Sequence, residues 1–412
     1  MPDYPALPAS GRAAVMQPLQ ISHLSIVSCI GAGQVATLSA LRSGASGLRP
    51  CEFESVNLPT YIGEVEPLAD FTLPKSLATF DCRNNRLAEM AIGQDGFEPA
   101  VARAIAQYGA RRIGLFLGTS TSGILQAELA YRARDADTGA LPADFDYQRT
   151  HNTGSLATYL HQRLGVAGVS FVVSCACAST AKVFGSAARM IEAGLCDAAI
   201  VGGADSLCLT TLYGFHALAL NAPGPCRPFD TARDGISIGE AAGFALLEKP
   251  QRNDSDDAVM LFGVGESNDA YHMSSPHPEG IGAKLAMERA LDAARFTPAD
   301  IDYINLHGTA TRVGDAAEDL AISALFDDRT PCSSTKGQTG HALGAAGIVE
   351  AIISVLAIRH GLLPGSAQTE TVDPSFRSRY QLTSEAARVD TVLSNSFGFG
   401  GGNCSLIFGR QR

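Results

Sequence analysis

The feature that most constrains the fold of this chain is residues 169–205, where a strand, a turn, a helix and a second strand follow one another. An apolar, β-branched run at 169–173 and a second apolar run at 198–201 predict two buried strands. The helix between them stops at Gly194, a residue type that commonly ends helices. One face of this helix is apolar, at Val183, Ala187 and Ile191. The pattern indicates an α/β fold, with the second strand closed by a glycine pair.

The turn of this unit carries Cys177 within the run of small residues 175–179. A thiol at the start of a helix lies at the positive end of the helix dipole and near unpaired backbone N–H groups. This position is expected to lower the pKa of Cys177 and to favour the nucleophilic thiolate. A plain buried cysteine is the alternative, and position alone favours it. Cys175, on the strand side of the turn, is interpreted as a packed residue.

Composition narrows the class of protein. The 31 Lys and Arg residues against 42 Asp and Glu residues give a net charge of −11, without a basic run, which argues against partners such as nucleic acid or an anionic membrane surface. We expect no apolar segment to approach the length of a membrane span, and residues 1–10 lack a signal pattern, so we expect a cytoplasmic protein. The ten cysteines form no CxxC pairs, which indicates reduced thiols and no metal site.

Strands and helices alternate along two halves of the chain that echo each other in the order of their elements. We expect a loose leader at 1–17, a first half at 18–250, a polar join at 251–257 and a second half at 258–412. Strands are expected at 19–30, 113–117, 243–248, 259–264, 303–306, 389–393 and 404–408, and helices at 34–41, 86–92, 99–108, 283–294, 316–325 and 345–360. This order predicts a duplicated fold with mixed, largely parallel sheets in five αβαβα layers.

Three more glycine-flanked polar stretches follow apolar strands, the position where α/β proteins place functional loops. These stretches are 306–311, 333–341 and 395–403, and two of them contain a histidine, His307 and His341. Taken singly, each histidine is more often structural than catalytic. Together with the Cys177 turn, the stretches indicate a cysteine and histidine site built from both halves.

These motifs, in this order, resemble those of the β-ketoacyl-acyl carrier protein synthases, the elongating condensing enzymes of the thiolase superfamily. The resemblance runs from about residue 19 to residue 408 and implies the thiolase-like five-layer fold. Besides Cys177, the residues that carry it are 307–309, 336–347, 395–401 and 227–235.

The resemblance implies a decarboxylative condensation that produces a 3-oxoacyl thioester on acyl carrier protein. Cys177 would take the acyl chain from an acyl thioester, and His307 and His341 would bind the malonyl thioester carbonyl and assist decarboxylation. Backbone N–H groups of Cys177 and Phe399 would form an oxyanion hole. The substrates arrive on the phosphopantetheine arm of the carrier protein, so no bound cofactor is implied.

Supporting roles follow from the same resemblance. Lys336 and Glu350 would be a charged pair that tunes the histidines, although a structural salt bridge is an equally good interpretation of this pair. Phe399 matches a gate of the acyl pocket. Thr309 and Thr311 match the family positions that form hydrogen bonds with the phosphopantetheine arm of the donor.

The acyl preference is open, because the turn at 118–123 has Thr121 where a bulky aliphatic residue or a glycine usually lines the acyl pocket. Gly402 replaces a usual threonine, which suggests a more mobile loop around Phe399. The Cys–His–His set separates the chain from Cys–His–Asn synthases. Thiolases use a second cysteine near the C-terminus, and Cys404 is displaced from that position into the last strand.

Departures of this kind from the family's usual motifs occur in enzymes of polyketide-like pathways, including those that make aryl polyenes. The alternative function is a non-catalytic partner subunit of a heterodimer, similar to a chain-length factor, although such subunits replace the nucleophile and this chain keeps Cys177. The family implies a homodimer, with a heterodimer possible. Because carrier proteins are acidic, we expect basic residues near the pocket mouth, with the candidates Lys75, Arg83, Arg86, Arg227 and Arg233.

Overall fold

A computed structural model describes residues 15–250 and 258–411 of the chain. Most of the predicted leader at 1–17 and the whole predicted join at 251–257 therefore lie outside the described residues. The main sheet has 12 strands, and β2 (Gly31–Ala32) pairs with the end of β1. The remaining strands run in the order β14 (Arg379–Tyr380), β12 (Pro331–Ser333), β11 (Tyr303–Asn305), β16 (Thr391–Phe397), β17 (Gly402–Arg410), β10 (Val259–Asn268), β1 (Leu19–Ser28), β9 (Ala241–Glu248), β7 (Ala198–Asp205), β5 (Ile113–Gly118) and β6 (Ser170–Val173).

The sheet consists of two halves that meet at β1 and β10. These two strands pair through a short antiparallel ladder, in which Leu19 lies opposite Leu261 and Gln20 opposite Met260. Parallel pairs occur toward the outer edges and antiparallel pairs near the join, so both halves are mixed as predicted. The structure differs from the expected pair of sheets in two ways. This ladder connects them into a single hydrogen-bonded path, and the sheet is not largely parallel, because the strand pairs around the join are antiparallel.

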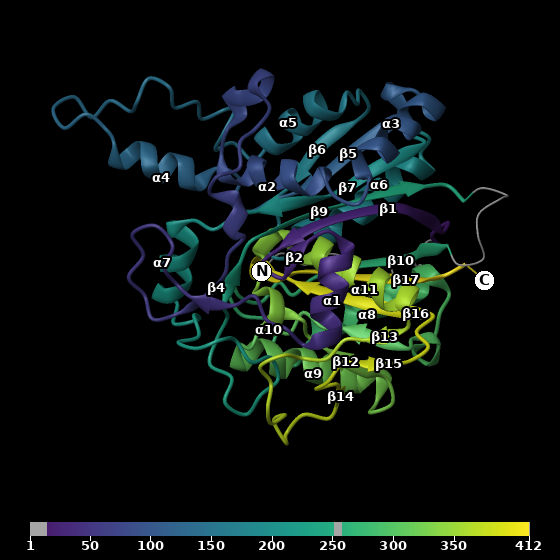
Figure 1. The fold of residues 1–412 in the computed structure, drawn as a ribbon. Coiled ribbons are helices and arrows are strands. Elements are labelled where there is room, and N and C mark those ends of the chain that lie inside the picture. Colours follow the sequence, from purple (N-terminus) through teal and green to yellow (C-terminus); the bar gives the residue numbers. More distant parts are fainter. Residues whose placement is uncertain (1–14, 251–257, 412) are drawn as a thin grey trace, which may run out of the picture.

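Helices cover and separate the two halves of the sheet, which confirms the five-layer thiolase-like fold (Figure 1). Two helices lie between the halves and contact strands of both, α6 (Ser179–Glu192) and α11 (Ala346–His360). One outer layer contains α2 (Arg83–Ile92), α3 (Phe97–Tyr108) and α5 (Ser155–Leu164). The other contains α8 (Ile281–Ala294) and α9 (Arg312–Phe326).

Smaller elements decorate this frame. The helices are α1 (Gln34–Ser43), α4 (Ile124–Arg132), α7 (Leu209–Ala217) and the short α10 (Lys336–Thr339). The short strands are β3 (Arg49–Pro50), β4 (Tyr61–Gly63), β8 (Ile238–Gly239), β13 (Leu362–Leu363) and β15 (Glu385–Ala386).

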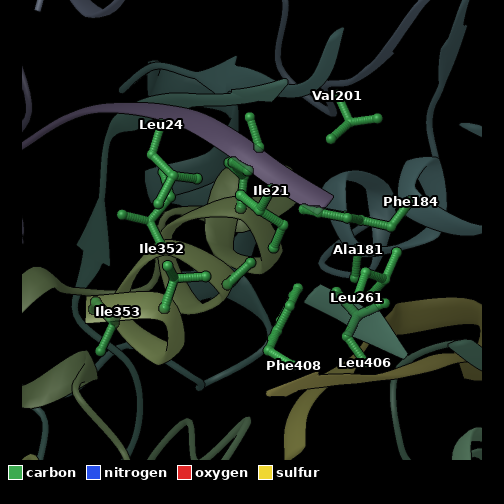
Figure 2. Close-up of a cluster of buried hydrophobic side chains, with 14 of the residues drawn as sticks. Ile21, Leu24, Ala181, Phe184, Val201, Leu261, Ile352, Ile353, Leu406 and Phe408 are labelled. Carbon is green, nitrogen blue, oxygen red and sulfur yellow. The ribbon is translucent and has the colours of Figure 1, made fainter. Parts of the chain in front are cut away.

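The main core lies between the sheet halves, where apolar side chains of strands and central helices interlock (Figure 2). Ile21 and Leu24 on β1 reach toward Ile352 on α11, and Phe184 on α6 packs edge-on against Phe408 on β17, with ring centroids 5.8 Å apart. Full burial of such a side chain stabilises the fold by roughly 1.5–3 kcal/mol. Both central helices are therefore fixed from two sides.

The central helix α11 corrects one expectation from the sequence. The 18-residue segment Leu343–His360 is long and apolar enough to span a membrane, with a mean hydropathy of 1.6. In the structure, 89% of this segment is buried inside the protein. The helix is apolar on all sides because it packs between the two halves of the sheet, so it is a core helix.

Several strands differ from their predictions, among them β7 in its extent and β6 in its burial. β7 continues past the glycine pair to Asp205. The neighbouring strand comes so close that a side chain at Gly203 would lie within 1.9 Å of the Gly118 carbonyl oxygen. The glycines therefore allow close strand pairing instead of ending the strand. β6 was expected to be buried, but it is a half-buried edge strand whose described partner is β5.

Candidate active site

Three of the predicted loops converge between the two halves of the molecule. Cys177 lies just before α6, His307 follows β11, and His341 follows α10. The Cys177 Sγ atom is 3.0 Å from Nε2 of His341, and the two imidazole rings are 5.3 Å apart at nearly right angles. One heteroatom of each side chain lies within 4.8 Å of the others, and all three residues are buried.

The environment of Cys177 differs from the one expected at a helix start. Burial raises the pKa of its thiol to about 12, although the Lys336 ammonium and the Phe399 backbone N–H each lower it. The expectation of a lowered pKa is therefore wrong, because loss of hydration outweighs the positive end of α6. The resting side chain is a neutral thiol with a histidine nitrogen beside it.

Both histidines are neutral at ordinary pH. Burial lowers the pKa of each ring well below its usual value, and the nearby Lys336 ammonium lowers it further. The backbone N–H of His307 donates to Glu318 at 2.8 Å, and that of Gly308 donates to the other Glu318 oxygen at 2.7 Å. Glu318, on α9, thus fixes the loop that presents His307.

Lys336 and Glu350 form a buried ion pair directly behind the histidines. The Lys336 ammonium donates both to Glu350 and to the backbone carbonyl of His307. Burial raises the pKa of Glu350 to about 7 despite the adjacent ammonium. Because Lys336 also contacts the backbone of His307 and lowers the pKa of both histidines, the pair is placed for both interpretations, a structural salt bridge and a pair that tunes the histidines.

A cavity of about 370 Å³ leads to the three side chains. Thr309 and Thr311 line it with hydroxyl oxygens 3.0 Å apart, and Phe399 packs against Phe215 with ring centroids separated by 5.4 Å. Thr121, predicted to line the acyl pocket, is not among the residues of this cavity. Its hydroxyl instead donates to the buried carboxylate of Asp205 at 2.8 Å.

Most of the basic residues proposed for carrier-protein docking have other partners. Arg83 pairs with Glu240 at 2.6 Å, and Arg86 pairs with Asp81 at 2.5 Å. Arg233 is buried and pairs with Asp373. Arg83 and Arg233 are therefore assigned to structural ion pairs. Arg86 is half-buried in a pair at the surface, Lys75 is exposed and Arg227 is half-buried, so these three stay candidates.

Two acidic residues of the site escaped the sequence analysis. Glu318 holds the His307 loop, and Asp205 lies at the end of β7 near Cys177. Each had a detectable signal, because an acidic residue in an apolar strand or on the buried face of a helix needs partners. What the sequence lacked was the identity of those partners.

The fold and these residues define a thiolase-like α/β enzyme with one cysteine and two histidines at the base of a cavity. Residues 80–253 match the N-terminal domain of beta-ketoacyl synthases and residues 258–370 their C-terminal domain. The chain is 33% identical to 3-oxoacyl-[acyl-carrier-protein] synthase 2 of Rhizobium meliloti, over 96% of this chain and 99% of that protein. The chain therefore belongs to the β-ketoacyl synthase family, and it is an acyltransferase of the 3-oxoacyl-[acyl-carrier-protein] synthase type.

Solved structures agree with this assignment. A chain in the complex of the ketosynthase ApeO with its chain length factor ApeC, from Xenorhabdus doucetiae, is 37% identical with a TM-score of 0.87, covering 96% of this chain and 98% of that one. A chain of the ishigamide ketosynthase/chain length factor structure is 28% identical with a TM-score of 0.87, covering 97% and 100%. The family acts on thioesters of acyl carrier protein, and the complete cysteine and histidine set argues against a non-catalytic subunit.

Proposed function

We propose that Cys177 is the acyl-accepting nucleophile of a decarboxylative condensation. The observation that carries the proposal is the 3.0 Å contact between its Sγ atom and Nε2 of His341 at the base of the cavity. His341 takes the thiol proton as Sγ attacks the acyl thioester carbonyl. The carrier's thiolate then leaves and takes this proton from His341, which becomes neutral again. A neutral thiol with a raised pKa needs such a base at the moment of attack.

The second step requires stabilisation of an enolate. Neutral His307 and His341 can each donate an N–H to the thioester oxygen of the malonyl group, where negative charge develops as carbon dioxide departs. The enolate carbon then forms a carbon–carbon bond with the acyl carbonyl, and the bond from that carbonyl to Cys177 Sγ breaks. Backbone N–H groups of Cys177 and Phe399 stabilise the oxyanion of this step; the Phe399 N–H already lies against Sγ.

The cavity is suited to substrates that arrive on a carrier protein. Thr309 and Thr311 present hydroxyls to the route by which a phosphopantetheine arm would enter, and Phe399 with Phe215 forms part of its wall. Lys336 supports the reaction indirectly, since it holds the His307 carbonyl.

The decisive experiment is detection of an acyl adduct on Cys177. The protein is incubated with acyl-carrier protein and analysed by intact mass, and 3-ketoacyl product is measured after malonyl-carrier protein is added. Cys177→Ala is expected to lose the adduct and the product while keeping its thermal stability. Cys175→Ala is the matched control and is expected to keep both. An unchanged yield of product from Cys177→Ala would refute the assignment.

We also propose that the active form of the protein is a dimer. The partner is a second copy of this chain or, as the alternative, a related chain. Among the described strands, β6 pairs with β5 alone and forms the end of the sheet, an edge to which another chain can add. The similar ApeO structure contains a chain length factor. Native mass spectrometry of the purified chain tests this proposal. A homodimer or a monomer that pairs with a co-expressed paralogue supports it, and a stable, fully active monomer refutes it.

The similarity to a ketosynthase that works with a chain length factor favours a specialised polyketide-like pathway over primary fatty acid synthesis. The ten unpaired cysteines support a reducing, cytoplasmic location. Product analysis with saturated and polyenyl primers tests the pathway, because a preference for saturated primers would refute it.

A further inference from the structure

The buried carboxylate of Asp205 has a role that the proposed reaction does not yet use. Asp205 ends β7, has no exposed surface and accepts six hydrogen bonds. Five come from the turn after β5, through the Thr119 hydroxyl and the backbone N–H and hydroxyl groups of Ser120 and Thr121, at 2.8 Å or less. The sixth donor is the backbone N–H of Gly344, three residues after His341.

The three hydroxyls are oriented, because each accepts a backbone N–H from another residue. The Thr119 hydroxyl accepts from Ser122 at 3.0 Å, and the Thr121 hydroxyl accepts from Ser206 at 3.1 Å. The Ser120 hydroxyl accepts from Gly344 at 3.2 Å. Each hydroxyl hydrogen is therefore directed at Asp205, the pattern expected around an acceptor-only carboxylate.

These hydrogen bonds connect the segment that carries Cys177 with the loop that carries His341. Gly344, in the His341 loop, donates its N–H to Asp205 and accepts at its carbonyl from the Thr180 hydroxyl at 2.6 Å. Thr180 is in the first turn of α6, three residues after Cys177. A side chain on Gly344 would lie 2.6 Å from Asp205, so the loop and the carboxylate are in close contact.

Asp205 also contributes charge near the nucleophile. Among the described ion pairs, no lysine or arginine neutralises it. The other groups that face Cys177 are His341 at 3.0 Å, His307, and the Lys336–Glu350 pair. Asp205 raises the pKa of the Cys177 thiol, whereas Lys336 lowers it.

We propose that Asp205 is a positioning residue that sets the distance between Cys177 and His341. This inference rests on the proposed function of that pair. Its geometric part acts through Gly344 and the turn at 119–121. Its electrostatic part adds to burial, which is the larger cause of the raised pKa of the Cys177 thiol.

The test compares Asp205→Asn with Asp319→Asn, a matched control. Asp319 is also buried and accepts N–H and hydroxyl groups, from Arg377 and Ser378, but it is not part of the cavity. Condensation kinetics are measured together with the iodoacetamide alkylation rate of Cys177 at pH 8, followed by peptide mass spectrometry with Cys175 as the internal reference.

We expect opposite effects on the two readouts for Asp205→Asn. Its kcat should fall by about a hundredfold, the loss typical of a misplacement near 1 Å, while KM for the carrier thioester stays nearly unchanged. Alkylation of Cys177 should become faster, by about tenfold for each unit by which the thiol pKa falls. Asp319→Asn should change neither rate. An unchanged kcat, or a fall in kcat without faster alkylation, overturns the proposal.

A second variant keeps the test valid if Asp205→Asn does not fold. Ser120→Ala removes the hydroxyl that bridges Asp205 and Gly344 but leaves the charge in place. It should lower kcat several-fold with an unchanged alkylation rate, and an unchanged kcat overturns the geometric part. Alkylation needs no carrier protein, so failure of the acyl adduct experiment in the wild type would refute the proposed function separately.

Discussion

Replacement of Lys336 by methionine separates the two interpretations of the buried ion pair. The side chains of Lys336 and Glu350 are only 2% and 3% exposed, so neither charge is hydrated. In Lys336→Met, Glu350 keeps a Ser396 hydroxyl at 3.4 Å as its remaining described side-chain donor, and the His307 carbonyl loses the ammonium. Breaking such a pair from one side leaves a buried charge without compensation.

The expected loss of stability can be worked out from this geometry. Removal of one partner of a buried pair destabilises a protein by about 3–5 kcal/mol. For 412 residues, the entropy of unfolding is about 0.9 kcal/mol per degree, from an average near 2.1 cal/mol/K per residue. The melting temperature should therefore fall by about 3–6 °C.

The assay is a thermal scan of the wild type, Lys336→Met and the double variant Lys336→Met/Glu350→Leu, with condensation measured in parallel. Because well-packed apolar groups can replace a buried pair at little cost, the double variant should regain most of the melting temperature. It should stay slow, because nothing then holds the His307 carbonyl. Recovery of full activity in the double variant would refute the positioning role, and a loss below 1 °C in the single variant would refute the electrostatic reasoning.

Two further predictions concern stability. Burial raises the pKa of Asp315 to about 7, so the folded chain binds a proton there that the unfolded chain releases near pH 4. This contribution to stability is present at low pH and is lost as pH rises through about 7. The melting temperature of Asp315→Asn relative to wild type should therefore increase from pH 4.5 to pH 8. A constant difference between the two melting temperatures would contradict the assignment. Gly203→Ala should destabilise the chain by at least about 1–3 kcal/mol because its new methyl group meets the Gly118 carbonyl. Gly214→Ala, on α7 with open space around it, should be stabilising by about 0.5–1 kcal/mol in the same denaturation experiment, and equal effects at both glycines would contradict the packing argument.

The sequence was most informative where chemistry and local structure coincide. The turns around Cys177, His307 and His341 could be recognised because small or glycine residues follow apolar strands, and the structure brings their side chains together. The alternation of strands and helices was likewise enough for the layered fold, which the similar structures confirm. Both features depend on neighbouring residues in the chain.

The features that could not be predicted depend on contacts between distant residues. The pKa of Cys177 follows from how completely the surrounding elements exclude water, which no local pattern records. In the sequence, Arg83 is a candidate for docking, but in the structure it pairs with Glu240, 157 residues away. Thr121 likewise meets Asp205 across 84 residues. Polar residues in such pairs look solvent-exposed in a sequence, since only the fold supplies the partner.

The apolar helix α11 has a consequence for biosynthesis. It leaves the ribosome before β16 and β17, which cover one of its sides, have been made. Until then the nascent chain presents an apolar segment that resembles a membrane anchor and is prone to aggregate or to engage chaperones. Glu350 lies near the middle of this segment, and an acidic side chain there opposes insertion into a bilayer. The carboxylate that later pairs with Lys336 thus also helps to keep the unfinished protein out of the membrane.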